Sequence, residues 1–176
     1  MPDYNVEILQ HPTEDDWQTV KLLALNTMGK TYMKDKEMSQ ELKAKYLRSE
    51  HSPIRALQFI IKMEIPYYVS THLVRHKYGV EHFIQSQRND RQDKYDRDQA
   101  PQGALVSHIM LVNAQALMAM SRKRLCGKAD KTTQKVWRTV VKKVLETNPE
   151  FKEVLVPNCE YLHSCPEFQS CGRWKE

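Results

Sequence analysis

The chain contains little glycine and no long apolar run. Five glycines among 176 residues leave little flexible linker, and no internal repeat or low-complexity segment interrupts the sequence. At this length, a single domain with a sizeable core is the expectation. No apolar run approaches the roughly 20 residues of a membrane span, and the N-terminus has no secretory character. We therefore expect a cytoplasmic protein with no membrane partner.

Cysteine is also scarce and unevenly placed. Cys126 stands alone, whereas Cys159, Cys165 and Cys171 lie at a regular spacing near the C-terminus. Disulfides are the weaker explanation for such residues in a cytoplasmic chain. A zinc site with His163 as fourth ligand is conceivable, but the usual short C-x2-4-C pair is absent. We expect free thiols and no metal.

The charge balance favours anionic partners without specifying them. Lys and Arg number 27 against 22 Asp and Glu, which gives a formal charge of +5 and a pI of about 9.0. A single-stranded nucleic-acid surface is the weakest interpretation, because acidic residues are interleaved through residues 90–98 and repel phosphates. A small anionic ligand is the stronger one.

Hydrophobic periodicity predicts a mixed α+β domain that is rich in helix. Two strands are expected, over residues 4–9 and 56–63. Helices are expected over residues 13–25, 36–47, 66–75, 105–125 and 131–146, and the helix over 105–125 is the longest. Thr13 followed by three acidic residues is a typical helix start. Residues 85–102 are nearly all polar and predict a long exposed loop. These elements form one domain over residues 1–155, followed by a cysteine-containing tail over residues 156–176.

Two short cationic motifs stand out against this background. Arg75-His76-Lys77 follows an apolar segment, and Ser86-Gln87-Arg88 comes about one strand length later. Burying such cations without partners would cost on the order of several kcal/mol of folding free energy, so these residues are not expected in the core. The guanidinium of arginine matches phosphate geometry, which predicts recognition of a phosphate.

Each of these residues also has a structural interpretation that the sequence leaves open. Arg75 and Arg88 could form surface ion pairs with Asp90 or Asp93, and His76 could be an ordinary helix-end residue. His82 could simply alternate with its neighbours on a strand. Arg124 could belong only to the basic end of a helix.

The chain resembles the flavin-dependent thymidylate synthases (the ThyX family), whose signature is R-H-R-x-x-S-x-N-E-x-S-x-R. Arg75-His76-Lys77 is similar to its opening triplet, and Ser86-Gln87-Arg88 to its closing S-x-R. His51-Ser52-Pro53 resembles the family's H-x-T-P-F-E-H segment. Residues 113–118 followed by Arg124, and then Gln134 and Arg138, are similar to a long helix and the A-Q-x-E-I-R segment after it.

The resemblance implies a small antiparallel sheet packed with several helices, including one long helix. It also implies reductive methylation of dUMP to dTMP, with FAD as cofactor and NADPH and methylenetetrahydrofolate as co-substrates, in a homotetramer whose active sites are shared between subunits. The implied catalytic residues are Arg75, Arg88 and Arg124. The implied nucleotide-binding residues are His72, Arg75, Ser86, Gln87, Arg88 and Arg124. The implied flavin-binding residues are Ser52, Arg75, His76, Lys77 and His82.

This chain departs from the signature in its first half. Lys77 replaces the second arginine, the segment from Arg75 to Arg88 carries one extra residue, and residues 80–84 replace the S-x-N-E core. In the family, the first half of the signature contacts flavin and the closing S-x-R contacts the nucleotide. This chain matches the nucleotide-contacting half better than the flavin-contacting half. Two further functions are therefore compatible with the sequence: a hydroxymethylase acting on a pyrimidine deoxynucleotide, and a nucleotide-binding homologue without catalysis.

Overall fold

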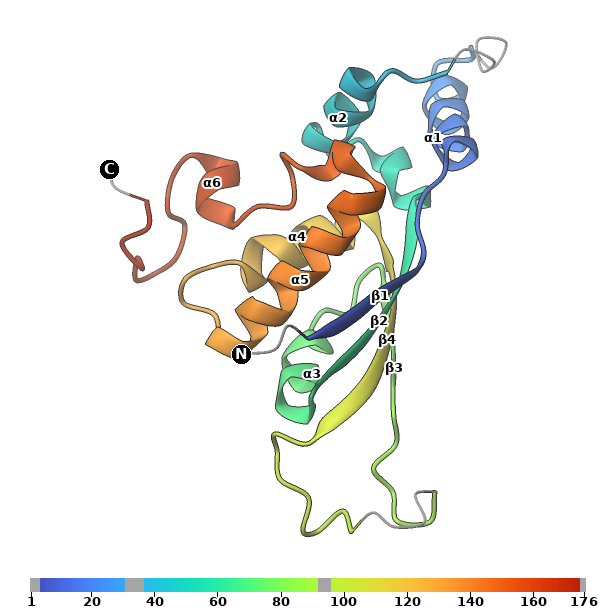
Figure 1. Cartoon of the computed structure of the whole chain (residues 1–176). Helices are drawn as coiled ribbons and strands as arrows, with labels where there is room; N and C mark the ends of the chain where they lie inside the picture. The colour runs from blue at the N-terminus through green and yellow to red at the C-terminus, as the bar shows by residue number, and fades with distance from the viewer. Residues whose placement is uncertain (1–3, 31–36, 92–95, 175–176) are drawn as a thin grey trace.

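Four strands form one antiparallel sheet in the computed structural model, which describes residues 4–30, 37–91 and 96–174. The strands are β1 (Asn5–Gln10), β2 (Gln58–Pro66), β3 (Val80–Ile84) and β4 (Leu105–Asn113), and their order in the sheet is β1-β2-β4-β3. The central strands β2 and β4 pair along their whole length, from Gln58 opposite Asn113 to Pro66 opposite Leu105. Figure 1 shows this sheet with its edge strands β1 and β3.

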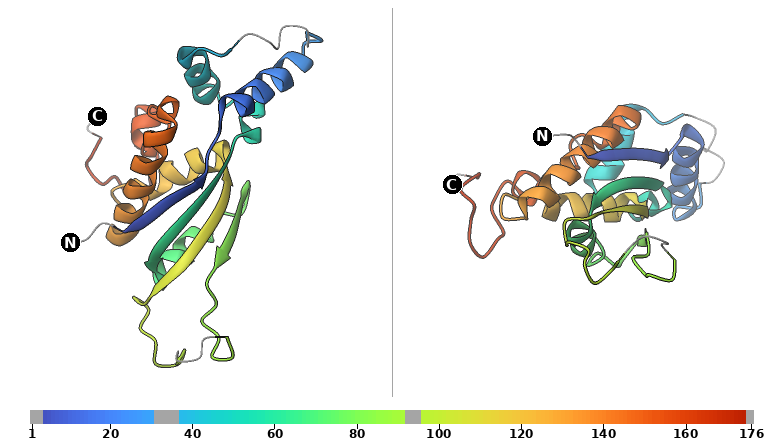
Figure 2. Two further views of the ribbon diagram at one scale, coloured as in Figure 1. Left: turned by 45° about the vertical axis from the view of Figure 1, so that its right-hand side comes forward. Right: turned by 60° about the horizontal axis from the view of Figure 1, so that its bottom comes forward.

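The helices are mostly short. They are α1 (Glu14–Asn26), α2 (Gln40–Arg48), α3 (Tyr67–Leu73), α4 (Ala114–Arg124), α5 (Lys131–Thr147) and α6 (Asn158–Leu162), with 3-10 turns η2 (Ser52–Ala56) and η3 (Pro149–Phe151). Of these, α3, α4 and α5 contact the sheet, whereas α1 and α2 lie toward its upper end in Figure 1. Figure 2 shows α4 and α5 lying together beside the sheet. None of the described helices is both long and apolar enough to cross a membrane.

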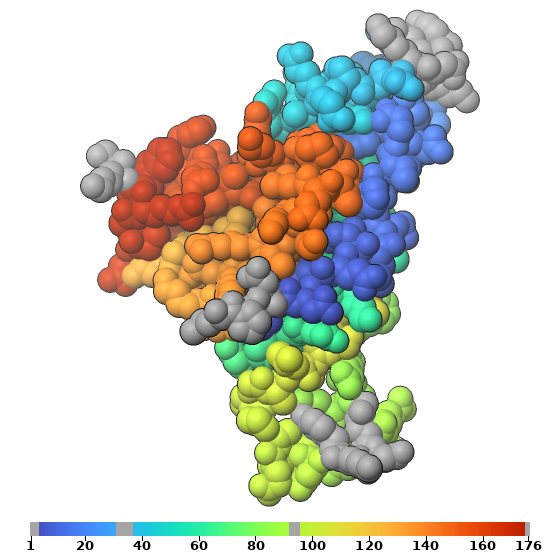
Figure 3. All heavy atoms as spheres, viewed as in Figure 1, coloured from blue at the N-terminus to red at the C-terminus, as the bar shows by residue number. Residues whose placement is uncertain are grey.

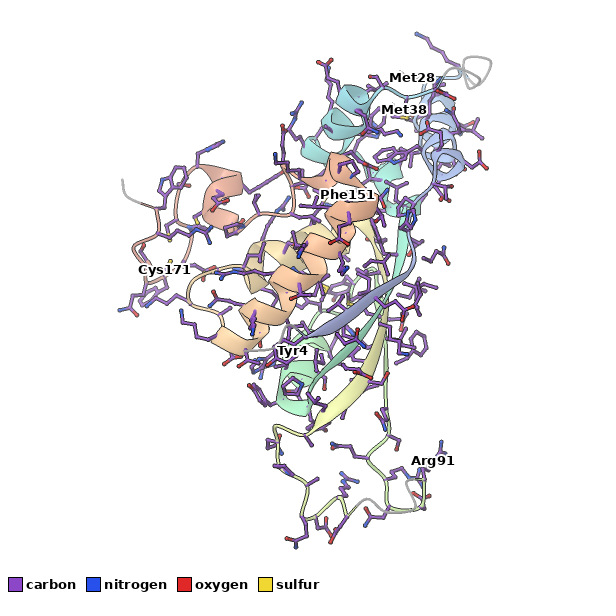
Figure 4. The ribbon with its side chains drawn as sticks, in the orientation of Figure 1. Tyr4, Met28, Met38, Arg91, Phe151 and Cys171 are labelled. Atoms are coloured by element: carbon purple, nitrogen blue, oxygen red, sulfur yellow. The ribbon has the colours of Figure 1, made fainter. Side chains whose placement is uncertain are left out.

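Side-chain alternation along the strands explains why the sheet has one covered face. In β2, the side chains of Phe59, Ile61, Met63 and Ile65 are fully buried, whereas the residues between them are exposed or half-buried, apart from the last, Pro66. The buried set packs against the helices, where Phe59 meets Phe151 edge-on at 5.3 Å between ring centroids. Figure 4 labels Phe151, the last residue of η3, which follows α5. The opposite face is covered by no element among the described residues.

Several predicted elements are confirmed with small shifts in their ends. The strands expected over 4–9 and 56–63 are β1 and β2, and the helix expected from Pro66 is α3. The helix expected from Thr13 is α1, whose first turn carries a capping box between Thr13 and Asp16. The helices expected over 36–47 and 131–146 are α2 and α5, although residue 36 lies outside the described residues. The α+β class with a small antiparallel sheet is therefore confirmed.

The helix predicted over residues 105–125 is wrong in its first half. Residues 105–113 form β4, and only residues 114–124 are helical. Val106, His108, Met110 and Val112 are buried at every second position, which is the period of a strand. Asn113 ends the strand and caps α4, because its side chain accepts from the Ala116 amide. Since β4 takes these residues, the longest described helix is α5, with 17 residues.

The loop between β3 and β4 extends away from the sheet and helices. Its described residues from Arg88 to Arg91 and from Asp96 to Gln99 are all exposed, as the sequence predicted. Figure 3 shows these segments as a separate lobe at the lower end of the molecule, and Figure 4 places Arg91 on it. The lobe therefore has little contact with the apolar core.

The C-terminal tail is attached to the domain through a polar network. In α6, the Tyr161 hydroxyl donates to the Glu50 carboxylate at 2.8 Å, and the Arg122 guanidinium stacks on the Tyr161 ring at 3.7 Å from its centroid. Arg122 also pairs with Glu50 at 2.6 Å. Glu50 has a left-handed backbone with φ of 48°, so this network holds a conformation that non-glycine residues rarely adopt.

Candidate functional site

The C-terminal end of α3 and the turn after it carry the first cationic motif. Pro66 precedes the helix and suits its start, because proline has no amide hydrogen to leave unpaired. The chain leaves the helix at Val74 and reaches β3 through Gly79, whose φ is 71°. In this turn Arg75 and Lys77 are exposed, whereas His76 is half-buried. The turn therefore presents two cations to solvent.

Arg124, the last residue of α4, joins this turn from the other side. Its Nε donates to His76 Nε2 at 3.0 Å, and its Nη2 donates to the carbonyl oxygen of His72 at 2.6 Å. Burial lowers the pKa of Arg124, and the nearby positive charge of Arg75 lowers the pKa further. Two arginines thus converge on one place from separate elements. Such convergence is unfavourable for the free protein and favourable for an anion.

His76 is neutral near pH 7 and acts here as a hydrogen-bond acceptor. Burial lowers the pKa of His76 to about 4, and the charges of Arg124 and His82 contribute to the same shift. Because Arg124 can only donate, His76 Nε2 must carry a lone pair. His76 does lie just beyond the C-terminal end of α3, but as a neutral acceptor it gains nothing from the helix dipole.

His72 is oriented by a hydrogen-bond chain from α5. The Thr133 hydroxyl donates to Asp130 Oδ1 at 3.0 Å, so its oxygen accepts from His72 Nδ1 at 2.8 Å. Asp130 caps α5 by accepting from the Thr133 amide, and this hydrogen bond is the largest cause that lowers the pKa of Asp130. These hydrogen bonds fix the orientation of the His72 ring relative to the turn.

The second motif lies at the opposite end of α3. Ser86, Gln87 and Arg88 line a hollow of about 250 Å3 together with Tyr67, the first residue of α3, and Arg97 from the loop. Since α3 has seven residues, the hollow and the turn are roughly 10 Å apart along the helix. Within one molecule, the structure does not bring the two motifs together.

Arg88 has a local partner in this arrangement. Its Nε and Nη2 donate to the two carboxylate oxygens of Asp90 at 2.9 and 2.6 Å. Both side chains are more than half exposed, so the pair is worth at most about 1 kcal/mol. This is the surface ion pair that the sequence left open, and an anionic ligand could replace Asp90 at little cost.

The predicted flavin-binding residues are spread over three places. Lys77 lies with Arg75 and His76 in the turn, and His82 lies behind them on β3. Ser52 lies exposed in η2, which contacts the first turn of α4 through Arg55 and Gln115 at 3.4 Å. Ser52 is therefore at the far end of α4 from Arg124.

Three residues near the site were not predicted. Asp130 and Thr133 orient His72, and His108 contacts His82 from β4. Asp130 could have been predicted from the sequence as the N-cap of α5, because it precedes the helix and stands three residues before Thr133. His108 was hidden because residues 105–113 were assigned to a helix. Among residues 4–30, 37–91 and 96–174, no three His, Cys, Asp or Glu side chains lie where they could hold a metal ion.

No protein-family model and no curated protein matches the sequence. Among solved structures, the chain resembles the crystal structure of a UMP/dUMP methylase, PolB from Streptomyces cacaoi, bound with 5-Br dUMP. The match covers 88% of this chain and 97% of that chain, at 16% identity and a TM-score of 0.66. The two chains share a fold. At this identity the likeness establishes the architecture alone, so the activity has to be argued from the site.

Proposed function

We propose that this protein binds a pyrimidine deoxynucleotide and transfers a one-carbon unit to it, as a flavin-dependent thymidylate synthase does. The observation that carries the proposal is the convergence of Arg75 and Arg124 beside the turn that follows α3. Arg124 is bonded to His72 and His76, and the charge of Arg75, the next residue before His76, acts on it. Two cations placed around one turn suit a phosphate monoester, which has the oxygens and charge to engage both. A fold shared with a methylase bound to 5-Br dUMP is the expected setting for such a ligand.

The nucleotide would lie between the turn and a second chain's loop. Arg75 and Arg124 would hold its phosphate or polarise its base, and His72 would contribute the ring nitrogen that Thr133 does not use. Ser86, Gln87 and Arg88 face a separate hollow and would complete the site of a neighbouring subunit. This division follows from the roughly 10 Å that separate the two motifs along α3.

FAD is the proposed cofactor, with NADPH and methylenetetrahydrofolate as co-substrates. The exposed cations Arg75 and Lys77 suit the phosphates of such a dinucleotide. His82 fits less well, since both of its ring nitrogens already have protein partners. When bound, the flavin supplies hydride transfer, and the protein supplies charge and position. The product could carry a methyl or a hydroxymethyl group.

A homotetramer follows from the same proposal, and the uncovered face of the sheet suits a second copy of the chain. Ile60, Ile109 and Leu111 are half-buried on this face, and Phe83 is 59% exposed. Lys62 and Glu81 flank them with opposite charges, so a two-fold arrangement could place each against the other. An exposed apolar patch with a self-complementary rim is typical of subunit contacts.

Titration of the purified protein with dUMP tests the nucleotide site. We expect Arg75→Ala to weaken dUMP binding by roughly 10- to 100-fold, because a charge-assisted contact is worth about 1.5–3 kcal/mol. Arg55→Ala is the matched control, since Arg55 is exposed at the other end of α4. Equal affinity in the two variants would remove the turn from the binding site. The visible absorption spectrum after loading with FAD separately tests the cofactor.

A further inference from the structure

Two histidines form a hydrogen-bonded pair behind the candidate site. His82 of β3 and His108 of β4 lie on the covered face of the sheet, with His82 Nδ1 and His108 Nε2 at 2.9 Å and the rings at 69° to each other. His108 is completely buried. On its other side, His82 Nε2 lies 3.0 Å from the carbonyl oxygen of His76. The pair therefore connects the sheet to the turn that carries Arg75.

The partners determine where the protons are. The His76 carbonyl oxygen can only accept, so His82 Nε2 carries a hydrogen. In a neutral His82, the Nδ1 atom then accepts, and His108 Nε2 must be the donor. This leaves a bare lone pair at His108 Nδ1, a buried atom without a partner among the described residues. The opposite proton placement would leave a buried N–H unpaired there, which folded proteins rarely tolerate.

The environment of His108 keeps its buried ring neutral, because burial and the neighbouring His82 lower the pKa of His108 to about 4. Desolvation of the buried ring opposes a positive charge on His108. Beyond His76, the next group is Arg124, whose Nε donates to the His76 ring at 3.0 Å, and the charge of Arg75 lowers the pKa of Arg124.

A pair of histidines that only filled space in the core would not need hydrogen bonds that all run from donor to acceptor in one order. The hydrogen bonds run one way, from His108 through His82 to the backbone of the turn, and the side chain of the same turn residue accepts from Arg124. The main-chain hydrogen bond from His76 to Leu73 tightens the beginning of the turn, and that from Asn113 to Gly79 holds its end. The His82 contact is the side-chain bond that holds the carbonyl between these two points.

We propose that His82 and His108 are positioning residues, which hold the carbonyl group of His76 and thereby aim Arg75 and Arg124 at their anion. Their role rests on the proposed function only in the identity of that anion as a pyrimidine nucleotide. Neither residue contacts the ligand. His82, predicted from the resemblance as a flavin-binding residue, acts instead through the backbone of the turn.

Nitrogen NMR of the histidine rings at neutral pH tests the proton placement without any ligand. We expect His82 and His108 both to be neutral with hydrogen on Nε2, and His76 to be neutral with hydrogen on Nδ1. His51 and His163, which are exposed, provide reference signals in the same spectrum. A charged His82, or hydrogen on Nδ1 of either member of the pair, overturns the proposal.

Paired substitutions at residue 108 test the positioning role. His108→Gln keeps an N–H donor near the place of Nε2, whereas His108→Phe removes it, and Met110→Leu is the control for volume changes in the same buried strand. We expect His108→Phe to shift the His76 ring signals and to weaken dUMP binding roughly three- to tenfold, the loss expected for one hydrogen bond. His108→Gln should restore both.

The two proposals fail in distinguishable ways. If the wild-type protein does not bind dUMP, the nucleotide proposal fails, while the His76 signals of the residue 108 variants still decide the positioning role. If His108→Phe leaves both the His76 signals and the dUMP affinity as in Met110→Leu, the positioning role is refuted. Should His108→Phe fail to fold, an unshifted His76 ring in His108→Ala gives the same refutation.

Discussion

The turn between α3 and β3 depends on a glycine with no room for a side chain. Gly79 has a φ of 71°, and a Cβ atom there would lie 2.5 Å from Nδ2 of Asn113. Asn113 cannot move freely, because its Oδ1 accepts from the Ala116 amide at 2.9 Å and so caps α4. One residue thus links the geometry of the turn to the start of the helix that carries Arg124.

We expect Gly79→Ala to lower the free energy of unfolding by about 1–3 kcal/mol, from backbone strain and the displaced cap. Urea denaturation followed by circular dichroism measures the change. Gly103→Ala is the matched control, since nothing lies within 4 Å of a Cβ there. Equal stability of the two variants would show that the turn can relax, and would weaken the description of Asn113 as fixed.

At the scale of elements, the start of α5 serves both the helix and the site. Asp130 accepts from the amide and the hydroxyl of Thr133, and Thr133 in turn orients His72. The pKa of Asp130 is lowered in the folded state, chiefly by the Thr133 amide. The Asp130 carboxylate therefore contributes its full stabilisation above the pKa that Asp130 has in the unfolded chain. This stabilisation is lost as the pH falls through the lower pKa that Asp130 has in the folded protein.

Asp130→Ala should cost about 0.5–2 kcal/mol of unfolding free energy at pH 7, as expected for a lost helix cap. The difference from wild type should shrink in acid, because the carboxylate then becomes protonated in both states. Urea denaturation at a series of pH values measures this. Asp130→Asn keeps an acceptor oxygen, so it should lose less than the alanine variant; an equal loss would assign the effect to charge alone.

The sequence predicted the elements whose hydrophobic residues recur with one clear period. It assigned the strand β4 to a helix, and it did not predict the short elements β3 and α6. In α5, Val136, Trp137, Val140 and Val144 recur at helical spacing, and all are buried. Residues 109–112 are apolar at every position and the polar Ser107 and His108 are neighbours, so the alternation of this strand emerges only when the sheet buries one set. The spacing of residues in the sequence could not predict that Arg75 and Arg124 serve one site, because they are 49 positions apart. Only the family resemblance implied it.

At the scale of the whole molecule, the bare face of the sheet and the projecting loop both look outward. Phe83 is 59% exposed on the bare face. The hollow lined by Ser86 also involves Arg88 and Arg97 of the projecting loop. Both features are explained if other copies of the chain lie against them. The homotetramer remains a prediction, as does a cytoplasmic location.

Phe83→Asp should therefore reduce the mass of the particle measured by light scattering after size exclusion. A buried carboxylate without a partner is too costly for an apolar contact. Phe168→Asp is the control, because Phe168 is fully exposed and belongs to the C-terminal tail, outside the sheet and the turn. If both variants keep the wild-type mass, the face of the sheet is not the contact between subunits.

The separation of the two motifs along α3 has a genetic consequence. In an assembly with shared sites, a chain damaged in the turn and a chain damaged in the loop each retain the half that the other lacks. A mixed population of the two mutant chains would then rebuild some intact sites, although either chain alone has none. Inheritance of two different defective copies would be milder than inheritance of two identical ones.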